Sequence, residues 1–171
     1  MYRKLIEIPS GSEEDIEKDV KRTFPETSEF QEPFSTGQNK LYNILKAYSQ
    51  YDTKVGYCQG YLLHHLLGMN YIAGILLRYI KDERLAYLCF MHIMYKFNWR
   101  RIYLNDMMEL VNLILCLTKR LEEQVPAVYK RFKEHEVTLN FIIDQYGRTI
   151  LIYLLKYIYL LLSHRIRCTH F

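Results

Sequence analysis

The chain has 171 residues, of which 50% are hydrophobic and 25% are charged, and its formal net charge at pH 7 is +4. This length and balance are typical of one globular domain that can bury a substantial core. Because the cationic residues are interspersed with acidic ones, the mild positive charge does not indicate nucleic-acid binding, and we expect no nucleic-acid partner.

Cysteine spacing and hydropathy predict the compartment. The four cysteines, at positions 58, 89, 116 and 168, are far apart in apolar surroundings, which indicates buried, reduced thiols in an intracellular protein. No apolar signal-peptide segment follows Met1. The most membrane-like run, residues 150–162, contains Lys156 and is shorter than the ~20 residues of a transmembrane helix. We expect a buried helix there and no integral membrane span.

The first predicted helix begins at Ser12, which can act as N-cap with Asp15 placed to bond back to it. Ile16 and Val20 lie four residues apart and mark the inward face of this helix. Pro25 ends it after Thr23 and Phe24. Asp19 and Arg22, three residues apart, share a face and can form an ion pair. Considered alone, they also fit an ordinary surface pair.

Residues 27–38 contain Pro33 and Gly37 and are expected to form a loop. A second helix follows, because apolar residues recur at i, i+3, i+4 and i+7: Leu41, Ile44, Leu45 and Tyr48. A turn at residues 52–56 then leads into a strongly apolar stretch, residues 54–74, whose helix is expected to run to Ile80. Asp82 restarts the chain, and the next inward face is predicted from Leu85, Leu88, Cys89 and His92.

Residues 98–101 are predicted to be a connection with two exposed cations, Arg100 and Arg101. Asn105 is expected to cap a long helix with the apolar residues Leu110, Val111, Ile114, Leu117 and Leu121. Pro126 fits the first turn of another helix that runs to about Glu134, and an apolar run follows Glu136. Since strand-like alternation persists nowhere and no 20–50-residue repeat occurs, the fold class is predicted to be all-α with many helices.

Metal, nucleophile and nucleotide sites find little support in the sequence. His64 and His65 are adjacent and would point about 100° apart on a helix, and Cys168 and His170 have no second pair nearby, so we expect no metal site. A nucleophilic pair of Cys58 with a histidine stays open, beside the simpler interpretation as a buried thiol. No phosphate-binding GxxxxGK loop is present, and no cofactor is expected.

A glutamine at the start of the apolar stretch is the more informative candidate. Tyr57-Cys58-Gln59-Gly60 places an uncharged amide at the mouth of the predicted helix. A glutamine there can orient a water or a phosphate oxygen through its donor and acceptor ends, although a polar residue at a helix start also serves as a cap.

Two motifs together resemble a known family. Ile16-x-x-Asp19-x-x-Arg22, followed by Thr23-Phe24-Pro25, resembles the IxxDxxR motif of the TBC-domain family, the GTPase-activating proteins of Rab GTPases. Tyr57-Cys58-Gln59-Gly60 resembles the YxQ motif of the same family. The resemblance covers about residues 15–145, and it identifies residues 1–171 as a single, incomplete TBC-like domain that is truncated at both ends.

This resemblance implies a function in trans. Arg22 would neutralise charge that develops on the transferred phosphoryl group, and Gln59 would orient the attacking water. Asp19 would hold Arg22, and Tyr57 would shape the backbone beside Gln59. The chain would then be an activator and not itself an enzyme. Its partner would be a Rab-type small GTPase in the GTP-bound form, in the cytoplasm or peripheral on endomembranes.

The sequence departs from the family pattern at residues 61–68, which separate YCQG from the MNYIAG segment that normally follows it directly. Because the inserted run favours a helix, we expect it to extend the next helix and to displace Gln59 by about 12 Å, which would leave a weak or inactive activator. The alternative is that residues 61–68 loop out and Gln59 keeps its place.

Two other functions stay open. The chain could be a catalytically inactive TBC-like module that binds a GTPase or a scaffold, or a membrane-surface protein that uses residues 150–162. The apolar run after Val137 is further expected to expose apolar surface and to promote self-association.

Overall fold

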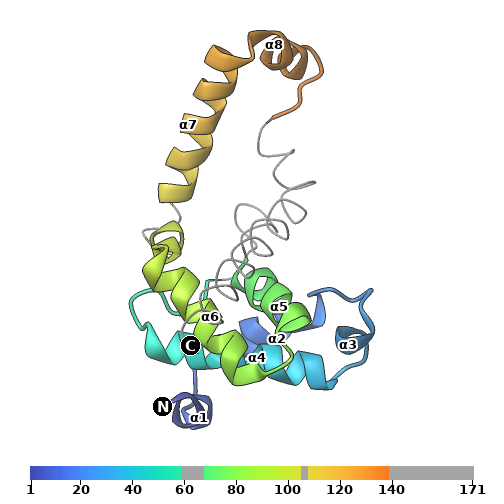
Figure 1. The fold of residues 1–171 in the computed structure, drawn as a ribbon, viewed down its shortest axis with the longest axis vertical. Helices are drawn as coiled ribbons and strands as arrows, with labels where there is room; N and C mark the ends of the chain where they lie inside the picture. The colour runs from blue at the N-terminus through green and yellow to red at the C-terminus, as the bar shows by residue number, and fades with distance from the viewer. Residues whose placement is uncertain (59–67, 105–107, 139–171) are drawn as a thin grey trace, which may run out of the picture.

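The computed structural model describes residues 1–58, 68–104 and 108–138 (Figure 1). All regular secondary structure in these residues is helical, which confirms the predicted all-α fold class. The helices are α1 (Tyr2–Glu7), α2 (Glu13–Lys21), α3 (Ser28–Gln31), α4 (Thr36–Tyr51), α5 (Met69–Tyr79), α6 (Glu83–Lys96), the 3-10 helix η1 (Trp99–Tyr103), α7 (Met108–Gln124) and α8 (Pro126–Glu134).

Helix α4 lies at the centre of the packed part of the molecule. It contacts α1, α2, α3, α5 and α6, and in Figure 1 these helices gather around it while α7 extends away to α8. The four residues predicted from the helical spacing of α4 are fully buried: Leu41, Ile44, Leu45 and Tyr48. Helix α5 is buried continuously from Met69 to Leu77, as expected of an apolar helix inside a core.

The predicted helix starts at Ser12 and Asp82 are confirmed, but the capping contacts at Ser12 differ from the prediction. Ser12 is the N-cap of α2, but its side chain makes no capping hydrogen bond. Instead, the backbone N–H of Ser10 donates to Glu13 Oε1 at 2.7 Å, so the predicted exchange between Ser12 and Asp15 is wrong. The chain restarts at Asp82 as predicted, and the Asp82 side chain caps α6 by accepting from the N–H of Leu85.

The segment predicted as a loop, residues 27–38, contains helical structure. Helix α3 forms within it, because Phe30 is buried in the core and the amide of Gln38 donates to the carbonyl of Phe30 at 2.7 Å. Ser35 caps α4 by accepting from the N–H of Gln38. Tertiary burial of one aromatic side chain thus outweighs the polar local sequence.

The inward face of α6 differs from the prediction. Leu88 is 52% exposed and Leu85 is also exposed, while the buried residues are Ala86, Tyr87, Phe90, Ile93 and Met94. Both sets have helical spacing, so spacing alone could not choose between them. The aromatic residues decide, because Phe90 meets Tyr48 edge-on at 5.1 Å between ring centroids and Tyr87 packs on Tyr2 at 4.4 Å.

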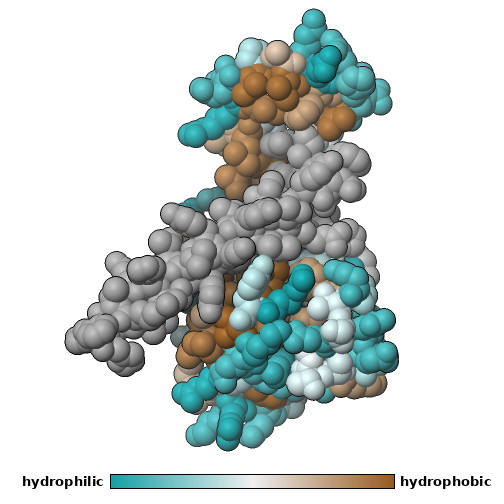
Figure 2. Space-filling model, turned by 45° about the vertical axis from the view of Figure 1, so that its right-hand side comes forward, coloured by the Kyte–Doolittle hydropathy of each residue, from teal (hydrophilic) through white to brown (hydrophobic). Residues whose placement is uncertain are grey.

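Helix α8 begins at Pro126 and ends at Glu134, as predicted. Leu110 and Ile114 of α7 join the core, whereas Leu117, predicted to face inward, is exposed. Figure 2 shows apolar side chains over this end of the molecule. The predicted cap Asn105 and the apolar run after residue 138 lie outside the described residues.

The cysteine and membrane predictions are partly tested. Cys58 and Cys89 are half-buried, but Cys116 is exposed on α7, so its predicted burial is wrong, and Cys168 lies outside the described residues. Among the residues that the structure describes, no helix combines the length and apolar character that crossing a bilayer requires. Residues 150–162 are outside that range.

The orientation of α6 predicts a contrast between two neighbouring substitutions. Phe90 is 0% exposed, so Phe90→Ala should lower the free energy of unfolding by about 3–5 kcal/mol, through lost burial and a cavity. Leu88→Ala on the exposed face should change it by less than about 0.5 kcal/mol. Urea unfolding followed by circular dichroism measures both. Equal losses would show that α6 is rotated from this arrangement.

Candidate functional site

The C-terminal end of α2 brings Asp19 and Arg22 together. Ile16 and Val20 anchor this helix in the core, and Asp19 lies on the same buried side. Arg22 Nη2 lies 2.6 Å from Asp19 Oδ1, with the Asp19 side chain 0% exposed and that of Arg22 22% exposed. The predicted ion pair is confirmed, but its interpretation as an ordinary surface pair is wrong because the carboxylate is fully buried.

Tyr57 reaches the same carboxylate from the segment after α4. Its hydroxyl donates to Asp19 Oδ2 at 2.5 Å. Burial raises the pKa of Tyr57, and the neighbouring Asp19 charge raises it further, so the hydroxyl stays protonated and acts as a donor at neutral pH. Tyr57 of the second motif and Arg22 of the first therefore meet at one buried carboxylate.

The turn before Tyr57 is fixed by Asp52. Its backbone carbonyl accepts from the N–H groups of Val55 and Gly56 at 3.1 and 2.6 Å, and Gly56 has a positive φ of 63° that glycine adopts readily. This is the predicted turn at residues 52–56. It delivers the chain directly to Tyr57.

A bidentate pair between Asp52 and Arg100 holds this turn against η1. Arg100 Nε donates to Asp52 Oδ2 at 2.9 Å, and Arg100 Nη2 donates to Oδ1 at 2.8 Å. Burial by itself raises the pKa of Asp52, but the hydrogen bonds and positive charge of Arg100, with hydrogen bonds from Tyr95 and Tyr48, outweigh it. The pKa of Asp52 therefore lies below its ordinary value. The prediction of Arg100 as an exposed cation is wrong. The sequence could not indicate this pair, because Arg100 and Asp52 are 48 residues apart and no local pattern links them.

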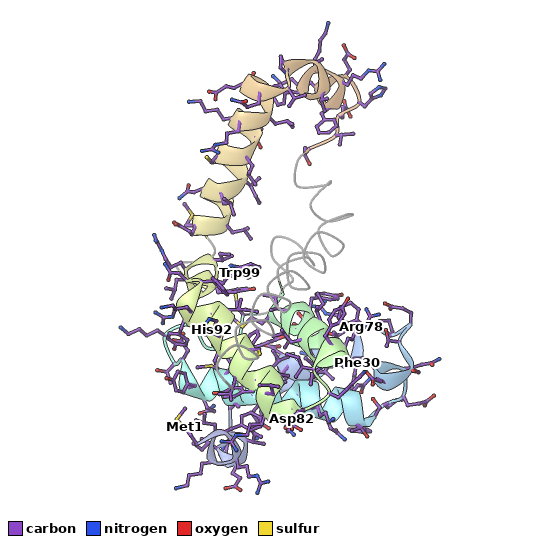
Figure 3. The ribbon with its side chains drawn as sticks, in the orientation of Figure 1. Met1, Phe30, Arg78, Asp82, His92 and Trp99 are labelled. Carbon is purple, nitrogen blue, oxygen red and sulfur yellow. The ribbon has the colours of Figure 1, made fainter. Side chains whose placement is uncertain are left out.

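Helix α5 packs directly against the residues that follow Arg22. Asn70 Nδ2 donates to Thr23 Oγ1 at 2.8 Å, and Thr23 Oγ1 donates to the Asp19 carbonyl at 2.6 Å. Phe24 has a positive φ of 49°, a rare conformation for a bulky residue. Its ring packs between Phe30, Tyr71 and the guanidinium of Arg78, and Figure 3 shows Phe30 and Arg78 on this side of the molecule.

The start of α5 overturns one expectation about the insertion. The helix begins at Met69, and its N-cap Gly68 is extended, with φ −59° and ψ 133°. A continuous helix from residues 61–68 into α5 is therefore wrong. A Cβ at Gly68 would lie 2.3 Å from Asn70 Oδ1, so the Asn70 side chain occupies the space beside the cap. Gln59 and residues 60–67 lie outside the described residues.

Metal binding finds no support in the described parts of the chain, where no group of three His, Cys, Asp or Glu side chains could hold an ion. The candidates His64, His65, Cys168 and His170 lie outside them.

The site that the structure describes consists of an arginine, the carboxylate that orients it and a tyrosine hydroxyl. Such a cation, held in one place and partly exposed, can bind a phosphate or a carboxylate.

Comparison with known proteins gives a consistent family match. The model of the Rab-GTPase-TBC domain matches residues 1–162. The chain is 33% identical over 133 residues to the ecotropic viral integration site 5 ortholog of Drosophila melanogaster, which covers 78% of this chain and 15% of that protein. It is 34% identical over 136 residues to human TBC1 domain family member 1, covering 80% and 11% respectively.

A relative from Caenorhabditis elegans, the Rab GTPase-activating protein eat-17, is 31% identical over 132 residues, which is 77% of this chain and 14% of that protein. The chain thus spans only about a tenth to a seventh of the length of these curated relatives.

The Asp52–Arg100 pair predicts a pH-dependent loss of stability. Arg100→Leu leaves a 3% exposed carboxylate without its cation and should cost about 3 kcal/mol at pH 7. Because the folded-state pKa of Asp52 is depressed in the parent, the stabilisation is present above the unfolded pKa of about 4 and is lost as pH falls through the folded value. The deficit of the variant should therefore shrink as pH falls below about 4.

Urea unfolding of parent and variant at several pH values measures this deficit. Arg101→Leu is the matched control, since Arg101 pairs with Glu109 on the surface and such pairs contribute about 0–1 kcal/mol. A deficit of equal size in both variants, or one that does not change with pH, would contradict the assigned role of Asp52.

Proposed function

The chain belongs to the Rab-GTPase-TBC domain family, and from this membership we propose that it stimulates GTP hydrolysis by a Rab-type small GTPase. It acts as an activator of its partner's reaction and has no substrate of its own. The observation that carries the proposal is the buried carboxylate of Asp19, which contacts both Arg22 and Tyr57. This contact joins the two motifs that the mechanism requires.

Arg22 is proposed as the catalytic arginine. Its guanidinium is held by Asp19 and remains partly exposed, so it can reach the phosphates of a nucleotide bound to another protein. There it neutralises the charge that spreads over the transferred phosphoryl group, which accelerates hydrolysis by roughly 10³–10⁵ in related GTPases. Because Asp19 orients the guanidinium before binding, less conformational freedom is lost when the complex forms.

Gln59 is proposed to orient the attacking water, with its amide oxygen accepting from the water. Support comes from Tyr57, two residues earlier, which is tied to Asp19, and from the turn that Arg100 holds through Asp52. Asp19 and Tyr57 are positioning residues in this account. They place Arg22 and the backbone near Gln59 and do not touch the nucleotide.

The proposed partner is the GTP-bound form of the GTPase, since only that form carries the phosphoryl group on which Arg22 acts. We propose that residues 1–171 form one TBC-like domain that meets this partner on the cytoplasmic side of endomembranes, as a peripheral protein. No cofactor takes part.

GTP hydrolysis by a panel of purified Rab GTPases, with and without the chain, tests the proposal. Binding without acceleration would instead identify a catalytically inactive interaction module.

Arg22→Lys should nearly abolish the acceleration. The lysine keeps a positive charge for Asp19, so the fold should persist, but an ammonium cannot reproduce the planar, multi-donor contact of a guanidinium. Single-turnover GTP hydrolysis measures the effect, and circular dichroism verifies the fold. Lys18→Arg, on the exposed side of α2, is the control and should leave the rate unchanged. Retained activity in Arg22→Lys would remove Arg22 from the mechanism.

Deleting residues 61–68 should change stability and activity little. Tyr57 and Asn70 are both attached to the end of α2, and the deletion leaves Gly60 to replace Gly68 as the residue before Met69. Shortening the chain between two fixed points changes the closure free energy by about 0.6 kcal/mol per twofold change in length. Urea unfolding and the hydrolysis assay test this. A large gain in activity after deletion would show that the insertion does displace Gln59.

A further inference from the structure

We propose that Asn70 and Gly74 of α5 are positioning residues for Arg22, and that they act through Thr23. The catalytic part of this inference rests on the proposed function, whereas the effect on Arg22 itself does not. Neither α5 residue was a candidate from the sequence. Both belong to a helix that meets the C-terminal end of α2 inside the core.

A buried chain of hydrogen bonds links α5 to α2. Asn70 Nδ2 donates to Thr23 Oγ1 at 2.8 Å, and the same hydroxyl donates to the carbonyl of Asp19 at 2.6 Å. A hydroxyl has one proton, so the Asn70 donor fixes the direction in which Thr23 donates. Asn70 is 1% exposed and Thr23 is 0% exposed. Loss of either partner would leave a buried polar group unsatisfied.

These bonds fix the backbone on both sides of Arg22. The Thr23 side chain is tied to the carbonyl of Asp19, and the Thr23 N–H donates to the carbonyl of Val20 at 3.2 Å. Arg22 lies between these points, directly before Thr23. A shift of Thr23 must therefore move the backbone from which the Arg22 side chain reaches Asp19 and the proposed partner.

Gly74 permits the close approach that this link requires. A Cβ at position 74 would lie 3.0 Å from Thr23 Cγ2 and 3.0 Å from Phe24 Cε2. Neither neighbour can yield freely, because Thr23 is hydrogen-bonded and Phe24 is packed against Tyr71 at 5.5 Å between ring centroids. An added methyl group would push the residues that follow Arg22 away from α5.

A purely structural role and a positioning role make different predictions. If Asn70 and Gly74 only stabilise the core, their substitution lowers the free energy of unfolding but leaves Arg22 as ordered as before in the folded molecule. If they position Arg22, substitution loosens or displaces the guanidinium while the fold persists. The Nε–H signal of Arg22 in nitrogen-15 NMR, assigned by its absence in Arg22→Lys, reports this order without any GTPase.

The experiment compares two disruptive substitutions with two controls in the full chain. Thr23→Val keeps the shape of the side chain and removes the hydroxyl, whereas Thr23→Ser keeps the hydroxyl. Gly74→Ala adds the methyl group that would press on Thr23 and Phe24. Gly11→Ala is the matched control, because a Cβ at Gly11 meets no atom within 4 Å. Each folded variant is measured by NMR and in the Rab hydrolysis assay.

We expect Thr23→Val and Gly74→Ala to shift the Arg22 Nε–H signal and to lower its order parameter. Their kcat for stimulated hydrolysis should fall about tenfold to a hundredfold, since misplacement near 1 Å has effects of this size, with KM little changed. Thr23→Ser and Gly11→Ala should resemble the parent. Because Thr23→Val preserves shape, it tests the inference even if Gly74→Ala fails to fold.

An unchanged Arg22 signal in folded Thr23→Val would overturn the inference, whatever happens to stability. If the parent stimulates no GTPase while Arg22 still loosens in Thr23→Val, the proposed function fails and the positioning link stands. If the parent is active and the variants raise KM without lowering kcat, the contacts of Asn70 and Gly74 with Thr23 and Phe24 affect partner binding. The inference is then also wrong.

Discussion

The buried carboxylate of Asp19 is the constraint on which the site depends. A charged group without solvent exposure is costly unless it is paired and hydrogen-bonded. Arg22 supplies the cation and Tyr57 supplies a hydroxyl donor. The need to satisfy one carboxylate therefore holds two segments together that are 38 residues apart in sequence. The same need leaves Arg22 oriented but partly exposed, as its proposed contact with a GTPase requires.

The surrounding helices secure this arrangement from two further directions. Arg100 of η1 holds the turn that leads to Tyr57 through a bidentate contact with Asp52, and α5 holds the residue after Arg22 through Asn70. Both contacts are between elements distant in sequence, and both use buried polar groups. We therefore expect substitutions at these distant contacts to alter the position of the partly exposed guanidinium.

The sequence predicted those features that depend on local spacing. The IxxDxxR pattern identified Arg22 and its ion pair, helical spacing identified the buried residues of α4, and Pro126 identified the start of α8. It failed where tertiary contacts decide between equivalent local patterns. The buried face of α6 was assigned to Leu88 in place of Phe90, Arg100 was expected to be exposed, and α3 was missed because burial of Phe30 outweighs its polar neighbours. The extended helix before α5 failed at Gly68. The role of Gln59 remains a prediction from the motif.

A double-mutant cycle between Arg22→Met and Tyr57→Phe tests the central claim most directly. Each single variant leaves Asp19 with one of these two partners, whereas the double variant leaves the buried carboxylate with neither. We predict that the double variant loses about 1 kcal/mol more free energy of unfolding than the sum of the single losses, within the range of coupled networks. Additive losses, within about 0.3–0.5 kcal/mol, would contradict the claim that Asp19 joins the two segments.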